Sequence, residues 1–263
     1  EGDGNFTRRI KKIKYFRHAY YRELFEKYFM LVCPGQERVE QIAKPWNIPL
    51  EACFFSGHPR NVYLHCESGA PCERSILYAP TYRWDAWSER NLVRQIEKAG
   101  EQIQVRLEET DSRLVIRLHP HTWRNYSRIL ERIEEKFDRI SVDREKDIYQ
   151  SLAKYAVVIT DYSSIAYDFI LLDRPVIFFN YDFKNFTDRE IKLNYDYEEY
   201  SPGIKTKTWE ETMDAVEAYL ADPEKDGPWR RKIRDEFYDM SVNDENNSRR
   251  IVEEIKRRLA ETE

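Results

Sequence analysis

The stretch VVITDYSSIAYDFILLDRPVIFF, residues 157–179, decides the fold class of this protein. Two apolar runs within it, 157–160 and 176–179, have the length and the β-branched or aromatic content of buried strands. The ten residues 163–172 between them have the composition of a helix. A strand, a helix and a second strand in so short a span indicate one βαβ unit of a parallel sheet.

The same alternation continues on both sides of that stretch. We expect earlier strands at 75–80, 113–118 and 140–142, with helices at 88–108, 123–137 and 147–156. Three further helices are expected after it, at 209–221, 228–238 and 247–260. Short apolar strands that alternate with helices predict an α/β fold, a Rossmann-type parallel sheet with helices on both faces.

The N-terminal part is less regular. A basic, aromatic helix is expected at 8–27, followed by a strand at 28–33, a helix at 36–44 and a strand at 52–55. One strand-helix-strand unit is too small for a whole Rossmann domain, so this N-terminal domain is expected to be incomplete. We divide the chain into the end of an N-terminal domain (1–68), a C-terminal Rossmann-like domain (69–240) and a C-terminal helix (241–263).

Composition excludes several classes of protein. The chain has 263 residues, 41% of them hydrophobic, which allows one large or two modest domains with a buried core. A net charge of -5 argues against a nucleic-acid partner. No apolar run approaches the roughly 20 residues of a membrane-spanning helix, and we expect no signal peptide. We expect a cytoplasmic protein, and because it begins with Glu1 rather than Met, a piece of a longer one.

The cysteines and acidic residues offer no metal site. None of the four cysteines forms a C-x-x-C pair or stands near clustered histidines, so we interpret them as reduced thiols. The sequence has no G-x-G-x-x-G, Walker, H-E-x-x-H or G-x-S-x-G motif, and no D-x-D pair. We therefore expect no metal and no cofactor, and we do not expect Ser163 to act as a nucleophile.

Polar residues follow several of the expected strands. In open parallel sheets ligands bind outside the carboxyl ends of the strands, so these residues are the candidates for a binding site. They are Pro80, Thr81 and Arg83 after the first strand, Arg117, His119 and His121 after the second, and Asp161, Ser163 and Ser164 after the strand at 157–160.

The helix expected to begin near Ser163 is a candidate anion site. The first turn of a helix has unpaired backbone N–H groups and the positive end of the helix dipole. The hydroxyls of Ser163 and Ser164 add donors, so a phosphate can be held there without glycines. The alternative is simple capping of the helix by Ser163 or Asp161.

Arg117, His119 and His121 stand at alternate positions. In an extended segment such residues share a face, so the three side chains are expected to point together. An imidazolium beside an arginine would suit a diphosphate from which a phosphate leaves with increasing charge. The alternative is that the histidines are structural.

Several of these segments, in this order, resemble the CDP-glycerol glycerophosphotransferase family. They are SGHPRN (56–61), ILYAPTYR (76–83), IRLHPH (116–121), the run 147–182, and DYEEYSPG (196–203). The family comprises wall teichoic acid primases and polymerases and related capsule enzymes. The resemblance implies a GT-B-like architecture in which the C-terminal domain holds most of the CDP donor. It also implies transfer of glycerol phosphate, or a similar polyol phosphate, to a hydroxyl of a lipid-linked acceptor without a metal.

The resemblance also assigns residues. Eight positions match the family's donor-binding positions: Arg60, Pro80, Thr81, Arg117, His119, Ser163, Ser164 and Asp168. His119 matches a histidine thought to assist the phosphate chemistry, which makes it the candidate catalytic residue. The sequence lacks the family's W-H-G segment, whose histidine is the proposed general base. We therefore expect this chain to bind donor without transferring polyol phosphate at a normal rate.

Other interpretations stay open at this point. One keeps the GT-B fold but uses a UDP-sugar, as in a glycosyltransferase or an epimerase. Another is a nucleotide-binding module without catalysis. Residues 8–27, in which basic and aromatic side chains interleave, are interpreted as a contact with an anionic membrane surface, which would place the protein on the inner face of the cell membrane. The alternative for this segment is a domain helix with a solvated basic face.

Overall fold

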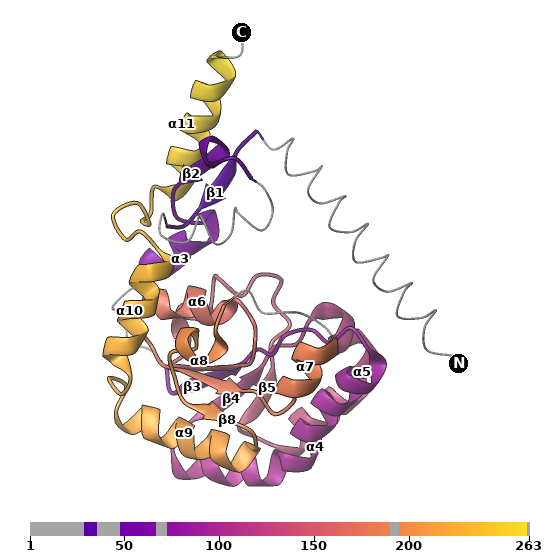
Figure 1. The fold of residues 1–263 in the computed structure, drawn as a ribbon. Helices are drawn as coiled ribbons and strands as arrows, with labels where there is room; N and C mark the ends of the chain where they lie inside the picture. The colour runs from indigo at the N-terminus through magenta and orange to yellow at the C-terminus, as the bar shows by residue number, and fades with distance from the viewer. Residues whose placement is uncertain (1–28, 36–47, 67–72, 190–194, 262–263) are drawn as a thin grey trace, which may run out of the picture. The chain divides into compact units, whose positions relative to one another are not determined.

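The computed structural model describes residues 29–35, 48–66, 73–189 and 195–261 (Figure 1). The chain divides into two compact units. One comprises Tyr63–Arg234, and the other comprises Glu1–Val62 together with Asp235–Glu263. The expected helices at 8–27 and 36–44 lie outside the described residues.

The larger unit is built on a six-stranded sheet whose strands are all parallel. The strands follow the order β5 (Ile140–Val142), β4 (Arg113–Ile116), β3 (Ser75–Tyr78), β6 (Val157–Thr160), β7 (Val176–Phe179) and β8 (Lys205–Thr206). The chain winds outward from β3 to β5 and then returns to β6 on the other side of β3. The order therefore reverses between β3 and β6, which is where ligands bind in open sheets.

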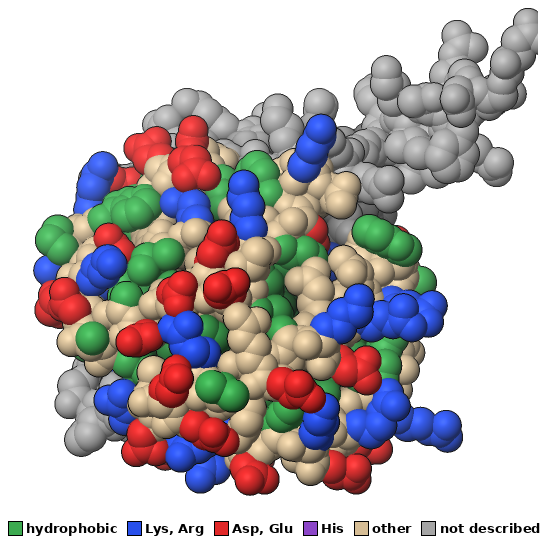
Figure 2. Space-filling model, turned by 90° about the horizontal axis from the view of Figure 1, so that it is seen from below, with side chains coloured by type: hydrophobic (Ala, Val, Ile, Leu, Met, Phe, Trp, Pro, Cys, Tyr) green, Lys and Arg blue, Asp and Glu red, His purple; other side chains and the backbone are tan. Residues whose placement is uncertain are grey.

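Both faces of this sheet are covered, as the short apolar strands predicted. Every residue of β3, β6 and β7 is buried. One face packs against three helices: α4 (Ala86–Glu109), which contacts both α5 (Pro120–Lys136) and α9 (Trp209–Ala221). The other face is covered by α6 (Ile165–Phe169) and by α8 (Tyr197–Tyr200), where the ring of Tyr197 meets Phe178 edge-on. On the side shown in Figure 2, acidic and basic side chains are interspersed.

Two expected helices differ from the prediction. Residues 147–156 form turns and the short 3-10 helix η3 (Leu152–Lys154) instead of an α-helix, because the Asp147 carboxylate accepts the backbone N–H of Tyr149 and stabilises a turn. The helix expected at 163–172 is shorter. It consists of α6 and the 3-10 helix η4 (Ile170–Leu172), and it ends where Asp173 adopts a φ of 52°.

The smaller unit pairs β1 (Leu31–Cys33) in parallel with β2 (Cys53–Phe55). The turn after β2 packs against the segment that precedes α11 (Asn247–Ala260). Asn247 donates a hydrogen bond to the carbonyl of His58, and a Cβ at Gly57 would lie 1.9 Å from Oδ1 of Asn243, so only glycine fits there. These contacts join α11 to the N-terminal residues in one unit.

The remaining described helices are α3 (Val62–Cys66), α7 (Phe183–Arg189) and α10 (Gly227–Phe237), with the 3-10 helices η1 (Leu50–Ala52) and η2 (Pro59–Asn61) in the smaller unit. In the part of the chain that the structure describes, no helix is both long and apolar enough to cross a bilayer.

Candidate functional site

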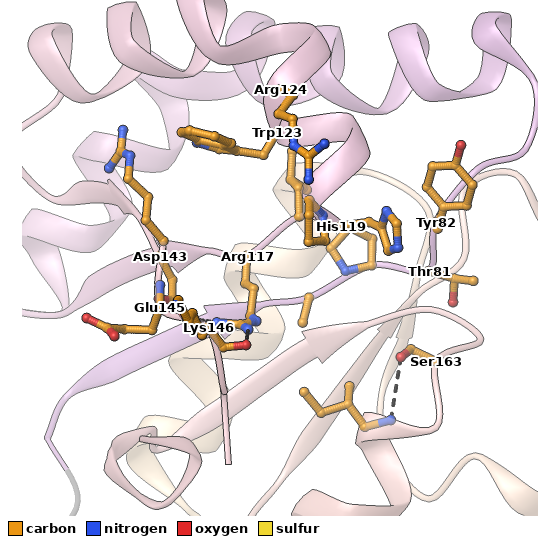
Figure 3. A pocket seen from close by; sticks show the side chains of 16 residues that line it. Thr81, Tyr82, Arg117, His119, Trp123, Arg124, Asp143, Glu145, Lys146 and Ser163 are labelled. Atoms are coloured by element: carbon orange, nitrogen blue, oxygen red, sulfur yellow. Dashed lines mark hydrogen bonds and ion pairs between the residues drawn. The ribbon is translucent and has the colours of Figure 1, made fainter. Parts of the chain in front are cut away.

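A pocket of about 780 Å³ opens at the carboxyl ends of β3, β4, β5 and β6 (Figure 3). Each strand supplies part of its lining through the segment that follows it: Pro80, Thr81 and Tyr82 after β3, Arg117 and His119 after β4, residues 143–146 after β5, and Ser163 and Ile165 after β6. Its volume is in the range of small-molecule sites, roughly 300–1,000 Å³. The pocket lies at the reversal of strand order, where the topology predicts a ligand.

Asp161 holds the wall that Thr81 forms. Its carboxylate accepts hydrogen bonds from the backbone N–H and the hydroxyl of Thr81, over 2.8 and 2.7 Å, and from Nη2 of Arg83 over 2.7 Å. Arg83 also donates from Nε to Asp182 over 2.8 Å. Burial by itself would lower the pKa of Arg83, but the charges of Asp161 and Asp182 outweigh it and raise that pKa.

Both Arg83 and Asp161 were expected to contact the ligand. The structure places them behind the wall instead, almost fully buried, and neither lines the pocket. Their bonds to Thr81 and to each other give them a supporting role, because they fix the position of the residues that do face the pocket.

Arg117 lines the pocket and anchors the loop that follows β5. Its Nη1 lies 2.5 Å from Oδ2 of Asp143, and its Nη2 donates to the carbonyl of Lys146 over 3.4 Å. About a fifth of the side chain is exposed. The guanidinium of Arg117 therefore lines the pocket and also connects the segment after β4 to the segment after β5.

His119 stands at the start of α5 with its ring against the ring of Tyr82, at 4.5 Å between centroids. Its Nδ1 accepts the backbone N–H of His121 over 3.3 Å. In a neutral imidazole one nitrogen accepts while the other carries the proton, so this bond leaves Nε2 as the donor. His119 is thus set to donate a hydrogen bond to an oxygen of a ligand in the pocket.

His121 lies outside this pocket. The helix α5 begins at Pro120, whose fixed φ suits the first helical position, so the extended segment ends at His119. Nδ1 of His121 is 3.3 Å from Oε1 of the buried Glu89 and 3.4 Å from the hydroxyl of Tyr82. Arg117 and His119 both line the pocket and His121 does not. The prediction that all three side chains point together is therefore wrong for His121.

The two serines after β6 are placed differently. Ser163 lines the pocket, and its Oγ lies 3.5 Å from the backbone N of Ile165 (Figure 3). Ser164 is exposed and lies outside the lining. Within the described residues, the backbone N–H groups of Ser163 and Ser164 have no hydrogen-bond acceptor. Asp161 does not cap α6, because its carboxylate accepts from Thr81, Arg83 and the N–H of Tyr162. Donors thus remain available to an anion beside Ser163.

Asp168 and Arg60 are not part of the lining. Asp168 is buried in α6, where its carboxylate accepts a hydrogen bond of 2.5 Å from the hydroxyl of Tyr149. Arg60 lies in η2, which belongs to the smaller compact unit, whereas the pocket belongs to the larger one.

Sequence reasoning missed part of the lining. Trp123, Arg124 and the loop 143–146 all face the pocket, as does Tyr82, which was expected among the residues that follow the strand at 75–80. The loop was detectable, because Asp-Arg-Glu-Lys directly follows the strand at 140–142 and the strand-end rule applies to it as to the others. Trp123 and Arg124 stand one helical turn inside α5 and follow from no strand end. The buried Nε1–H of Trp123 has no acceptor within the described residues.

The charges of the lining favour an anionic ligand. Four lining residues are cationic, Arg117, Arg124, Arg144 and Lys146, and two are anionic, Asp143 and Glu145. Cationic groups and N–H donors on one wall suit phosphate oxygens. No group of three or more His, Cys, Asp or Glu side chains in the described ranges is arranged to hold a metal ion.

The chain belongs to the family of CDP-glycerol:poly(glycerophosphate) glycerophosphotransferases, whose model matches residues 26–257. This confirms the resemblance that the motifs indicated. The match includes the strand ends that form the pocket and the turn at 56–61.

Individual relatives are teichoic acid enzymes. The chain is 29% identical over 177 residues to the teichoic acid poly(glycerol phosphate) polymerase of Bacillus subtilis strain 168, covering 61% of this chain and 23% of that protein. It is 27% identical over 218 residues to the polymerase of the same name from Bacillus spizizenii, covering 76% and 52%. The chain therefore spans about half of the second polymerase and less of the first.

A solved structure shares the fold. The wall teichoic acid polymerase TagF superimposes with a TM-score of 0.70 at 20% identity, over 95% of this chain and 62% of that one. A TagF variant soaked with CDPG gives a TM-score of 0.69 at 21% identity, over 95% and 61%. The expected GT-B-like α/β architecture is confirmed.

Proposed function

We propose that this chain is the donor-binding part of an enzyme that transfers glycerol phosphate, or a similar polyol phosphate, from a CDP-activated donor. The acceptor is a hydroxyl of a lipid-linked or polymer acceptor in teichoic acid or capsule synthesis. The observation that supports this most is the pocket itself, in which Ser163, Arg117 and His119 meet at the reversal of strand order. Membership of the glycerophosphotransferase family and the CDPG soak of TagF agree with it.

The diphosphate of the donor belongs between β6 and β4. The free N–H groups and the hydroxyl at Ser163 bind one phosphate, and Arg117 with Nε2–H of His119 binds the other. Trp123 and the loop 143–146 then surround the nucleoside. Hydrogen bonds to a charged phosphate contribute about 1.5–3 kcal/mol each, so two or three of them account for specific binding.

The same groups assist the reaction. The acceptor hydroxyl loses its proton to a base and its oxygen attacks the phosphorus that carries the polyol. The bond from that phosphorus to the bridging oxygen breaks, and CMP leaves with the electron pair. Charge grows on the leaving phosphate, so donors already aimed at it lower the barrier. We assign His119 the catalytic role of stabilising or protonating the bridging oxygen that leaves with CMP.

Arg60 and Asp168 keep their assignment as donor-binding residues by family resemblance only. For Asp168, burial and the bond to Tyr149 support an indirect role, in which it holds α6 in place behind Ser163. In the proposed division of labour, residues 69–240 bind the donor and residues 1–68 belong to the acceptor-side domain. The C-terminal helix, 241–263, packs with the latter.

We also propose contact with an anionic membrane surface through residues 8–27, which lie outside the described residues. Eight basic side chains in this segment outnumber two acidic ones, and five aromatic residues interleave with them. Each basic residue near anionic lipid contributes about 1 kcal/mol. Sedimentation with neutral and anionic vesicles tests this, and equal partitioning onto both would contradict it.

A calorimetric panel tests the function of the pocket. CDP-glycerol, CDP, UDP, GDP and UDP-N-acetylglucosamine are titrated separately into the chain. We expect CDP-glycerol and CDP to bind at least tenfold more tightly than the other three, a difference of about 1.4 kcal/mol. Preference for UDP-N-acetylglucosamine would replace the proposal with a UDP-sugar enzyme, and binding of none of the five would refute it.

A further inference from the structure

The charged side chains along the contact between α4 and α5 differ from one end of the contact to the other. Ion pairs join the middle of α4 to the carboxyl end of α5: Arg132 lies 3.2 Å from Glu97, and Lys136 lies 2.8 Å from Glu101. These pairs show that the helices run in parallel and that residues 35 positions apart face each other across the contact. The pattern is an ordinary one of opposite charges on neighbouring helices.

Two rows of side chains face each other here, one on α4 that includes Glu97 and Glu101, and one on α5 that includes Arg132 and Lys136. One helical turn closer to the pocket, the charged residues in both rows are all arginines. Helical periodicity places Arg94 above Glu97 on α4, and Arg128 above Arg132 on α5, so two arginines occupy neighbouring positions. Arg90 and Arg124 extend the rows by one further turn. The charges of Arg90 and Arg94 both lower the pKa of Tyr126, which is raised chiefly by burial, so these α4 side chains do lie beside α5.

All four arginines are exposed, and none has an ion-pair partner within the described residues. Two acids nearby are engaged elsewhere. Glu89 is buried and accepts from the hydroxyl of Thr122 over 2.7 Å, and Glu97 pairs with Arg132. Glu131, one turn after Arg128 on α5, forms no ion pair with it within the described residues. Like charges one turn apart repel and cost stability, so this arrangement lacks a partner that would neutralise it.

We infer that Arg90, Arg94, Arg124 and Arg128 form a docking surface, the α4–α5 arginine surface, for a polyanion of phosphodiester-linked polyol units. This inference rests on the proposed function in one respect, namely that the polyanion is the acceptor whose growing end enters the pocket. Arginine is suited to this ligand because its planar fork binds phosphate in a bidentate manner.

Continuity and spacing favour this occupant. Arg124 lines the pocket, so the surface begins where the polymer end reacts and leads away along the two helices. Arg90 and Arg94, like Arg124 and Arg128, are four residues apart, a rise of about 6 Å along a helix. That rise resembles the interval between successive phosphates in a polymer whose repeat is a three-carbon polyol phosphate.

An anionic membrane is the competing occupant, because Trp84 and Trp87 are exposed near the start of α4. The arginines are interspersed with the polar Asn91 and Asn125 and with the half-buried Tyr126 and Ile129. No large hydrophobic side chain in 88–98 or 120–132 is fully exposed, so these segments offer little apolar area for insertion into lipid. The observations therefore favour a flexible polyanion that lies along the rows over a lipid surface.

Fluorescence anisotropy with a labelled synthetic glycerol phosphate oligomer tests the inference on the whole chain. Arg94→Glu/Arg128→Glu should weaken binding of the oligomer about tenfold or more, and raised salt should weaken wild-type binding. Arg94→Gln/Arg128→Gln, which adds no negative charge, should show a smaller loss in the same direction. Lys154→Glu/Lys225→Glu is the matched control, because both lysines are exposed in the same unit and lie outside the pocket and the arginine surface.

The outcomes separate this inference from the proposed function. Weaker oligomer binding in the arginine variants, with CDP-glycerol affinity unchanged, supports it. Wild-type chain that does not bind the oligomer, or arginine variants that bind it as the control does, would overturn it. Loss of binding to phosphatidylglycerol vesicles in the arginine variants, with oligomer binding unaffected, would assign the surface to the membrane instead. Failure to bind CDP-glycerol would refute the function of the pocket while oligomer binding still supported this surface.

Discussion

The guanidinium of Arg83 lies 2.7 Å from the carboxylate of Asp161, with the two side chains only 1% and 2% exposed. Asp161 uses its other oxygen to hold the backbone and the hydroxyl of Thr81. A single carboxylate after β6 therefore positions the segment after β3, and the two sides of the pocket are joined beneath its floor. This relationship explains why an aspartate, Asp161, stands between the strand β6 and the helix α6.

Asp161→Ala should destabilise the protein by about 3–5 kcal/mol, because removal of one partner of a buried ion pair leaves the other charge uncompensated. Asp182 remains beside Arg83, which favours the lower end of that range. Urea unfolding measures the change. The control is Asp138→Ala at an exposed position, which should stay within about 0.5 kcal/mol of wild type. Equal stability of the two variants would contradict a structural role for Asp161.

The two histidines that follow β4 should separate in binding. His119→Ala should weaken CDP binding about tenfold, because it removes a donor to the diphosphate. His121→Ala should leave CDP affinity within about threefold, since His121 lies against Glu89 and Glu89 keeps Thr122 and Asn125 as partners. Calorimetric titration of both variants measures the difference. A larger loss in His121→Ala would reverse our assignment of the two residues.

Donor binding should not require a divalent metal. Cationic side chains and N–H groups already face the position of the diphosphate, so they supply the charge compensation that Mg²⁺ supplies in many nucleotide-sugar enzymes. Titration of CDP with EDTA and then with added Mg²⁺ checks this. We expect affinities within about twofold of each other. A strict magnesium requirement would instead favour a metal-using sugar transferase.

The stability of the chain should fall at alkaline pH. Burial, with the charge of Asp143, raises the pKa of Tyr155 from 10.0 to about 12. Between these values the unfolded chain has released this proton while the folded chain retains it. Stability is therefore lost as pH rises through this window, by up to about 2–3 kcal/mol. Urea midpoints at about pH 9 and about pH 11 measure about half of this loss, because the window extends to about pH 12.

Tyr155→Phe is the variant that checks the origin of that loss, because phenylalanine has no proton to release. Other buried tyrosines, among them Tyr162 and Tyr197, also have raised pKa values and contribute to the same trend. The variant should therefore show a smaller decrease than wild type between the two pH values. An identical decrease would show that Tyr155 does not contribute.

The sequence was sufficient to predict five of the six strands of the sheet, because these are short, apolar and separated by helical segments. The edge strand β8, with two residues, Lys205 and Thr206, has no apolar run and was not predicted. Residues 157–179 folded as the expected βαβ unit, and α9 and α11 have the predicted bounds. The helix predicted at 147–156 was wrong, since the Asp147 side chain competes with helical hydrogen bonds there and apolar spacing does not reveal this.

The sequence predicted where the site lies better than it predicted which side chains line it. The strand-end rule led to Ser163, Thr81, Arg117 and His119, which all line the pocket. It could not show that Arg83 and Asp161 pair in the interior, because that depends on the packing of segments 78 residues apart. It also could not place Trp123 and Arg124, whose position depends on α5 beginning at Pro120.

The most direct test of the account compares two neighbouring serines, because the pocket is proposed to hold the donor diphosphate beside Ser163. Calorimetry with CDP is performed on wild type, Ser163→Ala, Ser164→Ala and the double variant. We predict that the double variant weakens binding at least tenfold without unfolding, and that Ser163→Ala accounts for most of the loss, since Ser164 lies outside the lining. CDP affinity unchanged in the double variant would contradict the central claim.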